Sequence, residues 1–199
     1  MKQLLPFALF AFVASITPGP TNILILSNSA RFGLAATLPL VFSACGAAAL
    51  IVLLVGLGAG EWLLGHPQLQ QAMAWLGLAW LMYLAWQIAN SPADPIEADT
   101  DAKRLGPAGA AGLQLVNPKT WMMAFAVVSL FAGAGSTSIG YGTYALVFLL
   151  ISIPCLSAWA LLGRGAARFL RAGSRMKAFN VAMALLLVLS AVMGVWKAD

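Results

Sequence analysis

Two short polar segments interrupt stretches of the chain that are otherwise apolar and long enough to cross a membrane. The first segment contains Thr17, Pro18, Gly19, Pro20, Thr21 and Asn22. The second contains Gln114, Asn117, Pro118 and Lys119. Because the bilayer core holds no water, an interrupted helix is tolerated there only where protein or a polar cavity surrounds it. Two such breaks at corresponding places in two halves of a chain indicate a transporter binding site.

These breaks have the chemistry to bind a carboxylate. Each proline removes a helix donor and so leaves a carbonyl unpaired. Asn117 followed by Pro118 is typical of an N-cap and the first residue of a new helix. The half-helix that starts there would direct free N–H groups and its positive dipole end towards an anion, and Thr21 and Asn22 could do the same after Pro20. The alternative is that the prolines only kink helices whose unpaired groups are satisfied by neighbours.

Lys119 is the single residue for which the sequence gives the most specific functional prediction. It lies about eleven residues into its apolar stretch, which is ~16 Å along a helix and close to the middle of a ~30 Å hydrocarbon core. A lysine at that depth costs roughly 2.5–3.5 kcal/mol and is functional by default. We expect its ammonium group to face a substrate carboxylate. The alternative is a side chain that extends to the cytoplasmic interface.

The composition identifies an integral membrane protein. Of the 199 residues, 61% are hydrophobic and 9% are charged, whereas a soluble domain carries about 25% charged residues. Six apolar stretches approach the ~20 residues that a membrane-spanning helix needs. They cover residues 4–27, 36–60, 69–89, 108–133, 141–162 and 179–196. We therefore predict an all-α membrane fold with six transmembrane helices, of which the first and fourth are broken.

The chain divides into two groups of three spans within a single membrane transport domain, residues 1–199. The first repeat covers about 1–92, an acidic linker about 93–104, and the second repeat about 105–199. Because each half has an odd number of spans, halves that share a fold must be inverted relative to each other. Inverted repeats place the substrate near the middle of the membrane and allow the protein to open to either side.

The formal charge of +5 comes from basic residues whose distribution indicates the orientation in the membrane. Most basic residues fall in the first, third and fifth connections between spans, which share one side of the membrane. They are Arg31, Lys103, Arg104, Arg164, Arg168, Arg171, Arg175 and Lys177. The positive-inside rule makes this side cytoplasmic and both termini periplasmic. This distribution favours a bilayer partner and no nucleic-acid partner.

Both breaks, the L-V-N-P-K-T segment at 115–120, the six spans and the length resemble the LysE/RhtB family of bacterial amino-acid exporters. Segments 84–92 and 179–187 look like its cysteine/O-acetylserine exporter branch. The resemblance implies amino-acid efflux across the inner membrane, driven by the proton gradient. The positions that match the family's motifs are Thr17, Pro18, Gly19, Pro20, Asn22, Asn117, Pro118 and Lys119. Several relatives carry an acidic residue in the fifth span, where this chain reads I-S-I-P-C, so the proton carrier stays open.

The acidic residues point to a neutral substrate. None of the six acidic residues lies deep in a span, so a site for a dicationic amino acid would lack a partner for the second ammonium group. A zwitterion needs less, because its carboxylate can meet Lys119 and its ammonium can donate to carbonyls and asparagine oxygens. We predict small neutral amino acids as substrates. Proton coupling is possible, with His66 or Glu61 as peripheral candidates, and facilitated export is the alternative.

A membrane thiol–disulfide electron carrier is the rival class of function. Cys45 lies in the second span and Cys155 in the fifth, the matching element of the other half. The chain has no C-x-x-C motif, and both residues can be ordinary small apolar side chains. A small-xxx-small pair, Gly56 and Gly60, favours packing within the monomer and leaves a homodimer possible. No metal cluster, cofactor motif or nucleophile–base set is visible, so we predict no enzyme, metal or cofactor.

Overall fold

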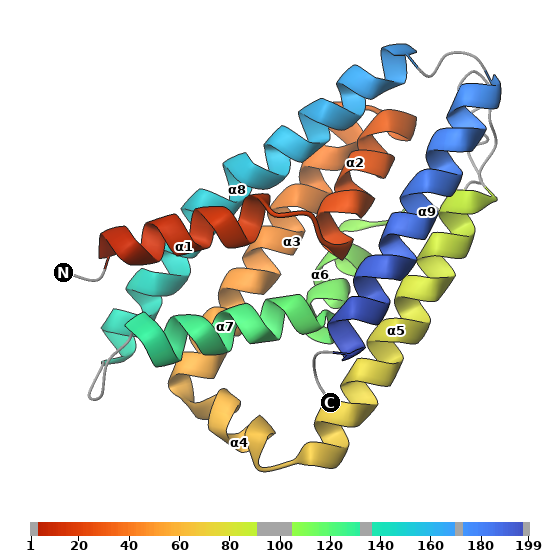
Figure 1. Cartoon of the computed structure of the whole chain (residues 1–199). Coiled ribbons are helices and arrows are strands. Elements are labelled where there is room, and N and C mark those ends of the chain that lie inside the picture. Colours follow the sequence, from red (N-terminus) through yellow and green to blue (C-terminus); the bar gives the residue numbers. More distant parts are fainter. Residues whose placement is uncertain (1–3, 91–104, 132–136, 170–172, 197–199) are drawn as a thin grey trace.

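The computed structural model describes residues 4–90, 105–131, 137–169 and 173–196 (Figure 1). These ranges form helices and contain no strand. The elements are α1 (Leu4–Ile16), α2 (Pro20–Phe32), α3 (Leu34–Leu54), the π-helical turn η1 (Val55–Ala59), α4 (Gly60–Leu64), α5 (Pro67–Ala89), α6 (Pro107–Val116), α7 (Pro118–Phe131), α8 (Ser138–Phe169) and α9 (Gly173–Trp196). The predicted acidic linker lies outside the described residues.

Several of these helices can cross a membrane. Leu34–Leu63, Pro67–Ala89 and Ser138–Ala166 are long and apolar enough, and α1 with α2 would form a fourth, broken span. The all-helical membrane architecture is therefore confirmed. The total of six spans and their inverted repetition stay predictions.

Both expected breaks are present. The axes of α1 and α2 differ by 54°, and α2 begins at Pro20 directly after Gly19. In the second half, α6 ends at Val116, Asn117 has extended backbone angles, and α7 begins at Pro118. Each new helix starts with a proline in its first position, where the missing N–H would have had no partner within the helix. The alternative in which these prolines only kink continuous helices is therefore wrong, because one helix ends and another begins at each break.

The predicted second span, residues 36–60, lies within the candidate span Leu34–Leu63. The helical geometry changes inside it, because α3 ends at Leu54 and passes into η1 and the short helix α4. Inside η1, Gly58 has a φ of 108°, a backbone conformation that residues with a Cβ rarely adopt. By contrast, Pro39 and Pro154 lie inside α3 and α8, which continue past them.

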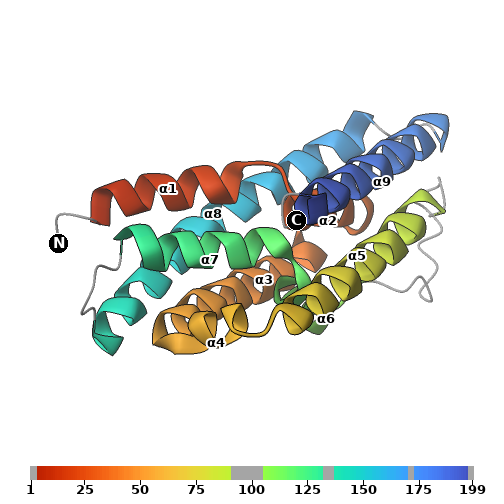
Figure 2. The same cartoon turned by 60° about the horizontal axis from the view of Figure 1, so that its bottom comes forward.

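The helices pack in pairs that join the two halves of the chain (Figures 1 and 2). Helix α3 packs against α8, and α5 packs against α9. The broken pair α1 and α2 packs on α8, while α6 and α7 pack on α3. Helices α2 and α8 pack closely at Gly163, where an added Cβ would lie 2.2 Å from the carbonyl oxygen of Leu26.

One end of the molecule gathers most of the described basic residues. The C-terminal ends of α2, α5 and α8 and the N-terminal end of α9 lie together, at the upper right of Figure 1. These ends carry Arg31, Arg164, Arg175 and Lys177. Helix α4 and the start of α1 lie away from that end (Figure 1). The grouping agrees with the side that the charge pattern predicts to be cytoplasmic, and the orientation itself stays a prediction.

The glycine pair of the second span, Gly56 and Gly60, packs against side chains of the same chain. A Cβ added to Gly56 would lie 2.4 Å from Cδ1 of Tyr141, and one added to Gly60 would lie 2.9 Å from Cε1 of Phe125. The missing side chains of both glycines therefore leave room for aromatic side chains of the same chain. This agrees with the expectation that the pair serves packing within the monomer. The homodimer stays a prediction.

Candidate functional site

The two breaks meet, and Lys119 joins them. Its Nζ donates a hydrogen bond of 2.7 Å to the carbonyl oxygen of Thr17. The side chain reaches that carbonyl by passing over Gly19, where an added Cβ would lie 3.0 Å from Cδ of Lys119. The ammonium group therefore turns to the first break. The alternative, in which it extends along its own helix to the interface, is not what the structure shows.

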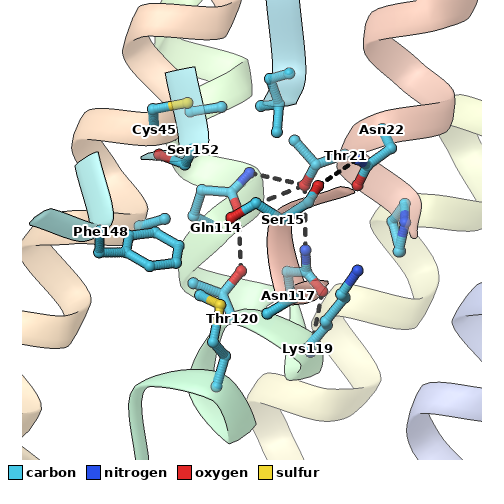
Figure 3. A pocket seen from close by; sticks show the side chains of 16 residues that line it. Ser15, Thr21, Asn22, Cys45, Gln114, Asn117, Lys119, Thr120, Phe148 and Ser152 are labelled. Carbon is cyan, nitrogen blue, oxygen red and sulfur yellow. Dashed lines mark hydrogen bonds between the residues drawn. The ribbon is translucent and has the colours of Figure 1, made fainter. Parts of the chain in front are cut away.

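A buried network of polar side chains lies beside this contact (Figure 3). The hydroxyl oxygen of Thr21 accepts hydrogen bonds from Nε2 of Gln114 at 3.0 Å and from Nδ2 of Asn117 at 3.2 Å. The hydroxyl of Thr120 donates to Oε1 of Gln114 at 2.9 Å. Because Thr21 comes from α2 and the others from α6, the second break and α7, the network fixes the two breaks relative to each other.

The second break is capped as the sequence predicts. Oδ1 of Asn117 accepts the backbone N–H of Lys119 at 3.1 Å, so Asn117 is the N-cap of α7. The first break differs, because α2 begins after Gly19 without a capping side chain. Asn22 instead turns back to α1, where its Nδ2 donates to the carbonyl oxygen of Ser15 at 2.9 Å.

Side chains of the protein satisfy carbonyls at the ends of the broken helices. The carbonyl oxygen of Ile16, unpaired because Pro20 has no N–H, accepts from Nε1 of Trp159 at 3.1 Å. The carbonyl oxygen of Leu115 accepts from Nε1 of Trp121 at 2.8 Å. These donors explain how interrupted helices are tolerated in a membrane protein. The Ile16 carbonyl is therefore already paired within the protein and is not free to accept a hydrogen bond from a substrate ammonium group.

A cavity of about 50 Å³ opens beside the network and is lined by residues of α1, α2, α3, α6, α7 and α8 and by Asn117. A space of that size accommodates a few water molecules. Six of the predicted site residues line it: Pro20, Thr21, Asn22, Gln114, Asn117 and Lys119. The other four support it: Thr17 through its carbonyl, Gly19 under the Lys119 side chain, and Pro18 and Pro118 in the backbone of the breaks.

The sequence analysis missed several lining residues. Ser15, Thr120 and Ser152 add hydroxyl groups to the cavity wall, and Phe148 adds an aromatic ring (Figure 3). The hydroxyl of Ser15 is buried and has no hydrogen-bond partner among the described residues. Thr120 directly follows Lys119 and could have been found from that position. Ser15 and Ser152 are single polar residues in apolar stretches, and only packing reveals which way they face.

The two cysteines lie close to this cavity. Cys45 lines it together with Ser152, whose hydroxyl donates a hydrogen bond to the carbonyl oxygen of Leu149 at 3.1 Å. Cys155 is buried as well, and both are free thiols. The helices that carry them, α3 and α8, are packed against each other.

The electrostatic character of the cavity follows from one residue. Lys119 is the only charged side chain that lines it, and no acidic residue does. In the described part of the chain, no group of three or more His, Cys, Asp and Glu residues could hold a metal ion. His66 lies between α4 and α5, where a ring nitrogen is 2.7 Å from the carbonyl oxygen of Trp62. An apolar pocket with one cation and several hydroxyl and amide groups is suited to a small molecule that carries one carboxylate.

The chain is similar in sequence to known membrane-transport proteins. Residues 12–195 match the family described as LysE type translocator. The cysteine/O-acetylserine efflux protein of Salmonella typhimurium is 32% identical over 191 residues, which is 94% of each chain. The protein of the same name from Escherichia coli K12 is 30% identical over 188 residues and 94% of each chain. No solved structure matches this chain.

Proposed function

The chain belongs to the LysE type translocator family, and we propose that it exports small neutral amino acids, such as cysteine and O-acetylserine, across the bacterial inner membrane. Membership of this family makes it a transporter and not an enzyme. The substrate class is supported by the names of the relatives and by the cavity. The observation that carries the proposal is Lys119, a lone cation at the point where two broken helices meet.

In this mechanism the substrate carboxylate takes the place of the Thr17 carbonyl as the partner of the Lys119 ammonium. The N-terminus of α7 adds a positive dipole end at the same place. The hydroxyl of Ser15, which is buried and has no hydrogen-bond partner among the described residues, would reach the substrate once the cavity widens. The side chain of the amino acid extends along Cys45 and Phe148. Uptake of a whole amino acid requires the cavity to widen, because its present volume is that of a few waters.

Alternating access between two inverted repeats is the proposed transport cycle. Its support is the packing of corresponding helices, α3 with α8 and α5 with α9, around the two breaks. The basic end of the molecule would face the cytoplasm, with both termini in the periplasm. We propose proton exchange as the driving reaction, although no acidic residue lines the central cavity.

Substrate selectivity tests the proposal. In counterflow with purified protein in liposomes, serine, cysteine and O-acetylserine should exchange at least ~10 times faster than lysine or arginine. The reason is that a second ammonium group would be buried opposite no carboxylate, which costs several kcal/mol. Repeating the assay with and without a pH gradient measures proton coupling. Faster exchange of lysine than of serine would refute the neutral-substrate proposal.

Removing the two thiols distinguishes amino-acid export from the rival electron-carrier function. The double variant Cys45→Ala/Cys155→Ala is expected to retain export within about threefold, because each substitution only removes a small group from a packed wall. A thiol–disulfide carrier would lose all activity. Serine efflux and electron transfer to a thiol acceptor are measured on the same vesicles, and loss of efflux in the double variant would favour the rival function.

A further inference from the structure

A second and larger cavity lies at the opposite end of α3 from the basic residues. It has a volume of about 510 Å³ and is lined by residues of η1, α4, α7 and α8. Volumes of about 300–1,000 Å³ are typical of sites for small molecules. Helix α4, which forms part of its wall, lies at the bottom of Figure 1, away from the ends of α2, α5 and α8. With the basic end in the cytoplasm, this cavity is on the periplasmic side.

One carboxylate gives this cavity its polarity. Glu61 is the only charged residue that lines it. It is also the only acidic residue in the described part of the chain. Ser138 and Tyr141 add hydroxyl-bearing side chains to the wall. The central cavity has the reverse character, with one lysine and no acid.

The same three helical elements line both cavities. The stretch from α3 into η1, together with α7 and α8, contributes residues to each. Along the first of these, Ala48 lines the central cavity and Val55 lines the outer one. They are seven residues apart, which is ~10 Å along an α-helix. The two cavities therefore lie at two successive levels along the same three helices.

An apolar layer separates the two levels. Val52, Ala124 and Ala145 lie between the lining positions of their helices, and all are buried in one cluster. Their side chains are small and carry no polar group, so the layer offers no binding site to a zwitterion. A substrate that leaves the central cavity towards the periplasm has to cross this layer and enters the outer cavity next.

We propose that the outer cavity is an exit site, in which Glu61 binds the ammonium group of the exported amino acid after its carboxylate has left Lys119. The proposal rests on the export function above. The two sites would then hold opposite ends of the same zwitterion in succession. Glu61 is exposed, and an ion pair in such a position contributes up to about 1 kcal/mol. A weak site of this kind is suited to release.

The closing experiment compares serine transport from the two faces of the membrane. Right-side-out vesicles present the outer cavity to added serine, and inside-out vesicles present the cytoplasmic side. For Glu61→Gln, the KM for serine from the periplasmic face should rise about fivefold, the factor that corresponds to an exposed ion pair. The KM from the cytoplasmic face should stay unchanged, which also shows that the variant is folded. Gln68→Ala, at an exposed position outside both cavities, is the control and should leave both values unchanged.

Other results would overturn the exit site. An unchanged KM at both faces would show that Glu61 does not bind the ammonium group. Unchanged KM values with a lost response to the pH gradient would make Glu61 a proton carrier. An equal rise at both faces would indicate a general structural effect, and Glu61→Asp, which keeps the charge, would then fail to restore the periplasmic value. If the unmodified protein transports no neutral amino acid in either vesicle, the proposed function fails independently of Glu61.

Discussion

Replacing Lys119 by methionine should lower the rate of neutral amino-acid export at least about 100-fold while the protein stays folded in the membrane. Lys119 is the only charged side chain in the central cavity, so the substrate carboxylate would be buried without a partner. Removing one member of a buried ion pair costs about 3–5 kcal/mol, which is a factor of more than 100. Methionine keeps most of the length of the lysine side chain, so the main changes are the lost charge and the lost hydrogen bond to the Thr17 carbonyl.

The matched control is Lys177→Met on α9. Lys177 is exposed at the basic end of the molecule, and its replacement should leave export within about twofold. Efflux from loaded liposomes measures transport, and size-exclusion chromatography in detergent measures folding. Near-normal efflux from a folded Lys119→Met protein would remove Lys119 from the binding site. Aggregation of that variant alone would mean that the contact between Lys119 and the Thr17 carbonyl is needed for folding.

Replacing Gly163 by alanine should destabilise the protein by about 2–3 kcal/mol, the upper part of the range for overpacking a core. The added Cβ would lie 2.2 Å from the carbonyl oxygen of Leu26 and 3.1 Å from the backbone nitrogen of Ala30. Both neighbours are backbone atoms, so α2 and α8 must move apart. The change is measured as a lower thermal unfolding temperature in detergent and a lower yield of folded protein.

Gly165, two residues further along α8, provides the control. An added Cβ there has no atom within 4 Å, so Gly165→Ala should be neutral or stabilise the helix by up to about 1 kcal/mol. Equal unfolding temperatures for the two variants would contradict the close packing of α2 against α8. Because α2 carries Thr21, the same packing holds one side of the central cavity.

The two breaks were predictable because several local signals coincide there. Two prolines flank Gly19, and Asn117 supplies a cap before Pro118, so the backbone has an alternative set of hydrogen bonds. A lone proline gives no such signal. Pro154 lies in the predicted fifth span, and α8 continues through it with its other hydrogen bonds in place.

The rest of the site depends on contacts between distant parts of the chain. The hydroxyl of Thr21 accepts hydrogen bonds from residues more than 90 positions away, and Trp159 donates to a carbonyl 143 positions away. No local pattern specifies such partners. The change of helix geometry at the end of α3 was likewise not specified by any local pattern. The glycines there were assigned to the second span without a change of helix geometry, but Gly58 adopts a positive φ and the helix changes to η1.

The hydrogen bond between Lys119 and the Thr17 carbonyl ties the first break to the second. Under the proposed mechanism, a substrate carboxylate would have to displace this bond, and part of its binding energy would be used to release the two broken helices from each other. Movement of the breaks would then be linked to the presence of an amino acid.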